Sequence, residues 1–161
     1  MFGRRQVPAA VKAVRLEPGE RRTSWALTPT DEPVLATSAG LRLPDGSRLD
    51  WPDIEKATWK RPFLEVVQVA AVSGAGRRWR LELADEGDLP AAVRSAVTAS
   101  VAWQNHVMLA PTGGVRVVGR RRPGQELLDW QVVYDEGTDV DDPLVRAQTE
   151  EILIDARRTI G

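Results

Sequence analysis

The sequence predicts an α+β protein that is mainly β: a bent antiparallel sheet or partly open barrel capped by one helix, followed by a β-hairpin and a C-terminal helix. Three observations predict this order. Between residues 16 and 84, short apolar runs alternate with Pro, Gly, Asp and Ser about every eight to twelve residues, which is typical of all-β chains. A helical period follows Asp88, and two further apolar runs begin after residue 111. The expected organisation is an N-terminal arm over residues 1–15, a β domain over 16–110, and the hairpin with its helix over 111–161.

Seven strands are expected in the first domain. Trp79, Leu81 and Leu83 alternate with polar residues, so one face of the sheet should be buried and the other solvated. Glycine-containing turns join neighbouring strands, as in Pro44-Asp45-Gly46 and Ser73-Gly74-Ala75-Gly76. The expected strands cover residues 21–28, 33–37, 40–43, 47–50, 54–60, 63–72 and 77–84.

A helix is expected from Asp88 to about residue 109. Asp88 is a good N-cap residue, and Pro90 suits the first turn of a helix. Val93, Val97 and Val101 then recur every four residues and would form an apolar stripe. Such a helix would plug the open end of the bent sheet or close its barrel.

The hairpin and the last helix are expected after Pro111. Residues 115–118 and 127–134 flank Arg122-Pro123-Gly124-Gln125, where Pro then Gly fits a type II turn. With this short loop, Val117 would face Trp130 on an apolar face. A longer tip stays open, because a two-residue type II loop splays its strands. Asp142-Pro143 then opens a helix that runs to Ile160.

Three local segments carry a family resemblance. They are Leu16-Glu17-Pro18-Gly19-Glu20, Val34-Leu35-Ala36-Thr37-Ser38-Ala39-Gly40-Leu41 and Leu49-Asp50-Trp51-Pro52-Asp53-Ile54. With the order of elements, they resemble the bacterial branch of the pleckstrin-homology-like (PH-like) fold over residues 16–109. The whole chain also resembles a family of high-GC bacterial proteins without an assigned activity. The resemblance implies a fold and no catalytic function.

Phosphoinositide binding, a known use of pleckstrin-homology domains, is not expected from this resemblance. It needs Lys and Arg in the loop after the first strand, where several phosphate charges must be matched at close range. That loop is Thr28-Pro29-Thr30-Asp31-Glu32-Pro33, which has two carboxylates and no base. An inositol phosphate headgroup would be repelled there.

The composition argues against most catalytic chemistry. The chain has 161 residues, no Cys and one His, which removes thiolate nucleophiles, Cys-bearing zinc sites and most nucleophilic relays. The acidic run over residues 135–142 lacks the ordered ligands of a helix-flanked calcium loop. No cofactor or metal is therefore expected. The favoured function is a non-enzymatic binding or scaffold module that contacts another protein or a second copy of itself.

The densest basic cluster consists of Arg116, Arg120, Arg121 and Arg122 in the expected hairpin. As an exposed edge it would suit RNA, DNA or an acidic protein surface. The alternative function is therefore a nucleic-acid accessory protein that uses this Arg-rich hairpin. Arg77, Arg78 and Arg80 would strengthen it if they lay beside it. The favoured interpretation is a solvated edge whose charges prevent aggregation, because no interleaved aromatic residue could stack on bases.

Charge is uneven along a chain whose formal net charge is -1. Residues 1–134 hold 19 basic and 15 acidic side chains, whereas residues 135–161 hold 3 and 8. The acidic end is interpreted as the solvated start and face of a helix, or as a tail that lies on the basic body or on a neighbouring subunit. No export signal or apolar stretch of membrane-spanning length is expected, so the predicted location is cytoplasmic.

Overall fold

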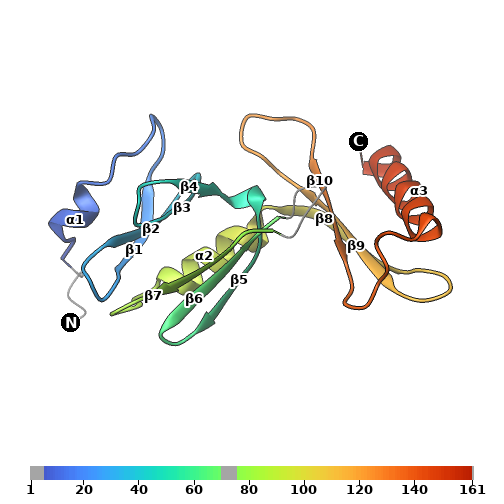
Figure 1. The fold of residues 1–161 in the computed structure, drawn as a ribbon. Coiled ribbons are helices and arrows are strands. Elements are labelled where there is room, and N and C mark those ends of the chain that lie inside the picture. The colour runs from blue at the N-terminus through green and yellow to red at the C-terminus, as the bar shows by residue number, and fades with distance from the viewer. Residues whose placement is uncertain (1–5, 70–75, 161) are drawn as a thin grey trace. The chain divides into compact units, whose positions relative to one another are not determined.

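The computed structural model describes residues 6–69 and 76–160 (Figure 1). The chain forms two compact units, unit 1 over Met1–Thr98 and unit 2 over Ala99–Gly161. The division falls at residues 98 and 99 rather than near residue 110, because residues that were expected to extend a helix of the first domain belong to a strand of unit 2.

The described part of unit 1 contains two antiparallel sheets. The first has four strands in the order β1-β2-β3-β4 and the second has three in the order β5-β6-β7. Their bounds are β1 Arg22–Leu27, β2 Pro33–Thr37, β3 Gly40–Arg42, β4 Arg48–Asp50, β5 Ile54–Lys60, β6 Phe63–Gln68 and β7 Arg78–Glu82. Among residues 6–69 and 76–99, three helices accompany them: α1 Ala9–Lys12, the 3-10 helix η1 Trp51–Asp53 and α2 Leu89–Ala99. Within the described residues, no ladder of strand pairs closes the two sheets into a barrel.

The expected strands of unit 1 are confirmed to within two residues at six of the seven positions. The seventh, expected over residues 63–72, ends at Gln68 in β6. Residues 70–72 and most of the expected turn, Ser73-Gly74-Ala75, lie outside the described residues. The prediction of a mainly β chain with antiparallel sheets and helices is confirmed.

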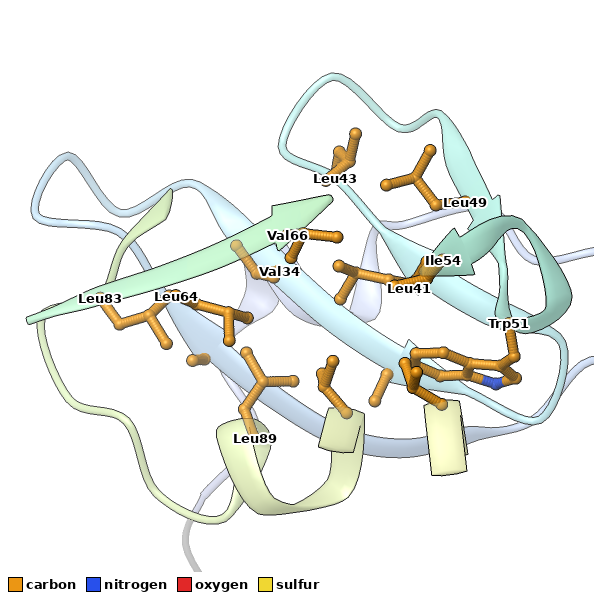
Figure 2. Packing of buried hydrophobic residues seen from close by; sticks show 14 residues of the cluster. Val34, Leu41, Leu43, Leu49, Trp51, Ile54, Leu64, Val66, Leu83 and Leu89 are labelled. Atoms are coloured by element: carbon orange, nitrogen blue, oxygen red, sulfur yellow. The ribbon is translucent and has the colours of Figure 1, made fainter. Parts of the chain in front are cut away.

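One apolar cluster joins both sheets of unit 1 to α2 (Figure 2). Val34 and Leu41 come from the first sheet, Leu64 and Val66 from the second, and all four are fully buried. Leu89 of α2 is also fully buried and points into the same cluster. The helix therefore excludes water from the apolar side of both sheets, as the sequence predicted for its first half.

The prediction that this helix continues to about residue 109 is wrong. α2 ends at Ala99, and residues 101–108 form strand β8 (Val101–Met108). β-branched and aromatic residues such as Val101 and Trp103 suit a strand, and β8 pairs along its length with β9 (Gly114–Arg120). Val101 continues the four-residue valine spacing, but the backbone hydrogen bonds to β9 outweigh that local pattern.

Unit 2 is a three-stranded antiparallel sheet of order β10-β9-β8 with one long helix. Strand β10 covers Asp129–Tyr134, and α3 covers Pro143–Ile160, which confirms the expected last helix. Apolar residues of α3 pack against the sheet, with Val145 beside Val115 and Leu109 in one cluster. The hydroxyl of Tyr134 donates a hydrogen bond of 3.1 Å to Thr149 Oγ1, which fixes the helix further.

The expected faces of the hairpin are confirmed, but its register is shifted. Val117 lies opposite Val132, and Trp130 lies opposite Gly119 rather than Val117. Residues 121–128 connect the two strands, so the loop is longer than a two-residue turn. The shift by two positions keeps every side chain on its expected face, because side chains alternate with a period of two.

A buried carboxylate ties the segment before β1 to the outer side of the first sheet. The side chain of Glu20 is only 1% exposed and forms an ion pair of 2.5 Å with Arg42 and one of 3.2 Å with Arg48. It also accepts hydrogen bonds from Thr37 Oγ1 (2.6 Å) and from the Glu17 amide (2.9 Å). Burial by itself raises the pKa of this carboxyl, but the hydrogen bonds from Arg42, Thr37 and Glu17 outweigh burial and lower the pKa from 4.5 to about 2.

Across the described residues, no helix combines the length and the apolar composition that crossing a membrane requires.

Replacing Leu89 by Ala is expected to lower the free energy of unfolding of unit 1 by about 2–5 kcal/mol, because it leaves a cavity where a fully buried side chain closes the cluster. Urea denaturation followed by tryptophan fluorescence measures the effect. Arg94→Ala on the exposed side of α2 is the control and should change the value by less than about 0.5 kcal/mol. Equal effects of the two substitutions would contradict the closing role of α2.

Glu20 should make unit 1 sensitive to acid. Its carboxyl has a lower pKa in the folded state than in the unfolded chain, so its stabilisation is complete above pH 4.5 and is lost as the pH falls toward 2. The loss amounts to roughly 3 kcal/mol. Urea titrations at a series of pH values should therefore show a flatter pH dependence for Glu20→Gln than for the wild type. The exposed neighbour Glu17, as Glu17→Gln, is the control, and parallel curves for Glu20→Gln and wild type would refute the assignment.

Candidate functional site

The sheet β5-β6-β7 has an inner and an outer face because successive side chains alternate. Its inner face contributes Val66 and its partly buried neighbours Ala57 and Trp79 to the apolar cluster of unit 1. The side chains between them point the other way. The outer face is thus left free of the core and available to solvent or to a partner.

Two rows of side chains cross this outer face from strand to strand. In the first, Lys56 lies opposite Val67, and Val67 lies opposite Arg78. We call these three residues the cationic row. In the second, Thr58, Glu65 and Arg80 are aligned in the same way. Neighbouring strands are about 4.8 Å apart, so the backbones of Lys56 and Arg78 are separated by about 10 Å, with an apolar side chain between them.

A hollow of about 490 Å³ lies over these strands. Its volume falls in the range of small-ligand sites and would also admit the side chains of a polypeptide segment. Both rows border it. The residues that line it are Glu55, Lys56, Thr58, Glu65, Val66, Val67, Gly76, Arg78, Trp79 and Arg80.

The charges of the second row are already matched. Glu65 lies 3.8 Å from Arg80 and 4.0 Å from Lys60, and the Arg80 guanidinium sits 3.6 Å from the centre of the Phe63 ring. Lys56 and Arg78 are exposed, and within the described part of the chain neither forms an ion pair. Lys56, Arg78 and Arg80 outnumber Glu55 and Glu65 by one in the lining, so the hollow has a net positive charge that attracts an anionic group.

The arginine cluster expected in the hairpin is only partly exposed. Arg120 is 4% exposed, and it donates hydrogen bonds of 2.7 Å to Gln131 Oε1 and to Ser100 Oγ. Arg122 donates to Asp129 Oδ2, also at 2.7 Å. The expectation that Arg120 lies on an exposed edge is wrong, because this position of β9 is covered and its guanidinium satisfies buried polar groups. Arg116 and Arg121 are exposed, as expected.

The basic residues that would strengthen the hairpin belong to the other unit. Arg77, Arg78 and Arg80 lie in or beside β7 of unit 1, whereas the hairpin lies in unit 2. The Arg77 guanidinium sits 5.0 Å from the centre of the Trp79 ring, so that arginine is already engaged.

His106 has a partner that the sequence did not indicate. It lies on β8, and its Nε2 is 2.7 Å from Asp135 Oδ2 at the far side of the sheet. The carboxylate crosses the intervening strand over Gly114, where any Cβ atom would overlap Asp135 Oδ2. Both side chains are about two-fifths exposed. No local motif could reveal this pair, since it depends on the register of three strands.

Metal ligation finds no support in the described residues, among which no three or more His, Asp or Glu side chains are grouped to hold an ion. The loop between β1 and β2 displays Asp31 and Glu32 as exposed carboxylates, so an anionic headgroup would meet negative charge there. The positive charges of the hollow lie on a different part of unit 1.

Comparisons with protein-family models, with curated proteins and with solved structures give no match for this chain.

Arg120 and Arg121 provide a test of the partly buried hairpin. Arg120→Ala removes two hydrogen bonds to buried groups and is expected to lower the free energy of unfolding of unit 2 by about 1–3 kcal/mol. Arg121→Ala removes an exposed charge and should change it by less than about 0.5 kcal/mol. Thermal denaturation of both variants measures the difference, and equal melting temperatures would argue against the buried position of Arg120.

Proposed function

We propose that this chain is a non-enzymatic protein-binding module with a PH-like unit 1, and that the outer face of β5-β6-β7 binds an acidic segment of a partner protein. The PH-like assignment draws support from a four-stranded sheet followed by a three-stranded sheet and a helix, the order that the family resemblance implies. The location that goes with this proposal is the cytoplasm.

One observation carries the proposal: the cationic row places two exposed cations, neither of which forms an ion pair in the described residues, on either side of Val67 at the hollow. A polypeptide with two carboxylates and an apolar side chain between them would match this arrangement. The two carboxylates would pair with Lys56 and Arg78, and the apolar side chain would cover Val67. Thr58 adds a hydroxyl that accepts or donates a hydrogen bond.

The expected affinity is modest and depends on salt. Exposed ion pairs contribute about 0.2–1 kcal/mol each, and ions screen them strongly at physiological ionic strength. Such a site suits a reversible contact in which charge provides selectivity and a fast association rate.

Nucleic-acid binding by the hairpin has less support. Two of its four arginines, Arg120 and Arg122, already bind side chains of unit 2. The two that are left, Arg116 and Arg121, make a small phosphate-binding surface, since each phosphate contact contributes separately to affinity.

A titration with a labelled peptide rich in Glu and Val, compared with its counterpart in which Gln replaces every Glu, tests the proposal. Fluorescence anisotropy should show that the acidic peptide binds and the neutral peptide does not. Binding of the acidic peptide should weaken at high salt. Lys56→Glu combined with Arg78→Glu should weaken it at least about tenfold, because two attractions become repulsions. Arg21→Glu combined with Arg94→Glu reverses two exposed charges elsewhere in unit 1 and is the matched control.

Two outcomes would reject the proposal. One is equal binding of the neutral peptide, and the other is acidic-peptide binding that survives reversal of Lys56 and Arg78. Gel shifts with RNA and DNA distinguish the alternative: tight binding that is lost in Arg116→Ala with Arg121→Ala would favour a nucleic-acid function.

A further inference from the structure

A segment of this same chain has the chemistry that the cationic row would recognise. Residues 135–142, which connect β10 to α3, contain five carboxylates and no basic residue. We call this segment the acidic loop. It is the most acidic stretch of the sequence, and it belongs to unit 2, whereas the cationic row belongs to unit 1.

Three of the five carboxylates have partners within unit 2. Asp135 binds His106, Asp141 lies 3.2 Å from Arg146, and Asp142 accepts a hydrogen bond from the Leu144 amide at the start of α3. These contacts explain the acidic residues closest to the sheet and to the helix.

The other two carboxylates, Glu136 and Asp139, have no cationic partner among the residues that the structure describes. Both are exposed, and the Asp139 carboxylate accepts a hydrogen bond of 3.1 Å from the Asp141 amide. Val140, the next residue, is 44% exposed although it is apolar. The acidic loop thus presents two free negative charges beside an exposed apolar side chain.

We propose that the acidic loop of one copy of this chain occupies the hollow of a second copy. Glu136 and Asp139 pair with Lys56 and Arg78, and the exposed Val140, which follows Asp139, adds an apolar contact at the edge of the hollow. This inference rests on the proposed function and names its partner.

The charges agree, and the acidic loop is turned rather than extended. The Thr138 amide donates a hydrogen bond of 3.1 Å to the Asp135 carbonyl, so the backbones of Glu136 and Asp139 lie closer than the about 10 Å that three extended residues span. The long side chains of Glu136, Lys56 and Arg78 must cover the remaining separation across the two strand spacings. Glu55 and Glu65 also line the hollow, but Glu65 is held by Arg80 at 3.8 Å and by Lys60 at 4.0 Å. With Lys56, Arg78 and Arg80 against Glu55 and Glu65, the lining keeps a net positive charge.

Each copy carries one acidic loop and one hollow, so the contact joins two different surfaces. A reciprocal exchange between two copies gives a closed dimer, and a one-way contact gives longer chains. Both are forms of self-association that strengthen with concentration and weaken with salt.

Sedimentation velocity of the full chain over a range of concentrations tests the inference with two charge-reversal variants. One reverses the hollow, as Lys56→Glu with Arg78→Glu, and the other reverses the loop, as Glu136→Lys with Asp139→Lys. Each variant alone should associate at least about tenfold more weakly than the wild type, because its loop and hollow repel. A mixture of the two should associate again, since the loop of each variant complements the hollow of the other.

The matched control is Asp31→Lys with Glu32→Lys, which reverses two exposed carboxylates in another loop and should leave self-association unchanged. A chain that is monomeric at every concentration but still binds the acidic peptide would overturn this inference and leave the proposed function standing. If the chain is monomeric and the acidic peptide also fails to bind, both this inference and the proposed function are rejected. A monomer whose hollow binds the peptide more tightly after reversal of the loop would show that the loop occupies the hollow of its own chain, which also overturns the proposal.

Discussion

The apolar cluster of unit 1 must be shielded from water on the sides of both sheets, and this constraint organises the rest of the unit. Helix α2 meets it with Leu89, Val93 and Val97, which lie in the same cluster as residues of both sheets. Each strand of β5-β6-β7 therefore commits one set of side chains to the core. The other set, which includes Lys56 and Arg78, is released from packing and is free to be polar.

Most strands could be predicted because their signals are local. Turn residues bound each apolar run, and alternation identifies the two faces, as in β7. The helix after Asp88 was extended too far because Val97 and Val101 have a spacing that fits a helix, whereas the pairing of residues 101–108 with β9 involves residues distant in the sequence. The predicted register of the hairpin is wrong for a related reason. Register depends on the length of the loop, and Pro123 and Gly124 do not determine that length.

The candidate site was harder to predict than the fold. A run such as Arg120-Arg121-Arg122 is conspicuous in the sequence, yet Arg120 is buried and serves the structure of unit 2. The cationic row is invisible in the sequence, because Lys56 and Arg78 are 22 positions apart and meet Val67 only through the registers of two strand pairs. Local charge density was therefore a poor guide to which cations are available.

Gly114 couples positions that are far apart in the chain. Because Gly114 has no side chain, the carboxylate of Asp135 can cross β9 and reach His106. This carboxylate occupies the position that a Cβ atom of residue 114 would take. Positions 106, 114 and 135 are consequently expected to co-vary among related sequences. A lineage that loses the imidazole or the carboxylate no longer needs an empty position between them, and a larger residue there would become tolerable.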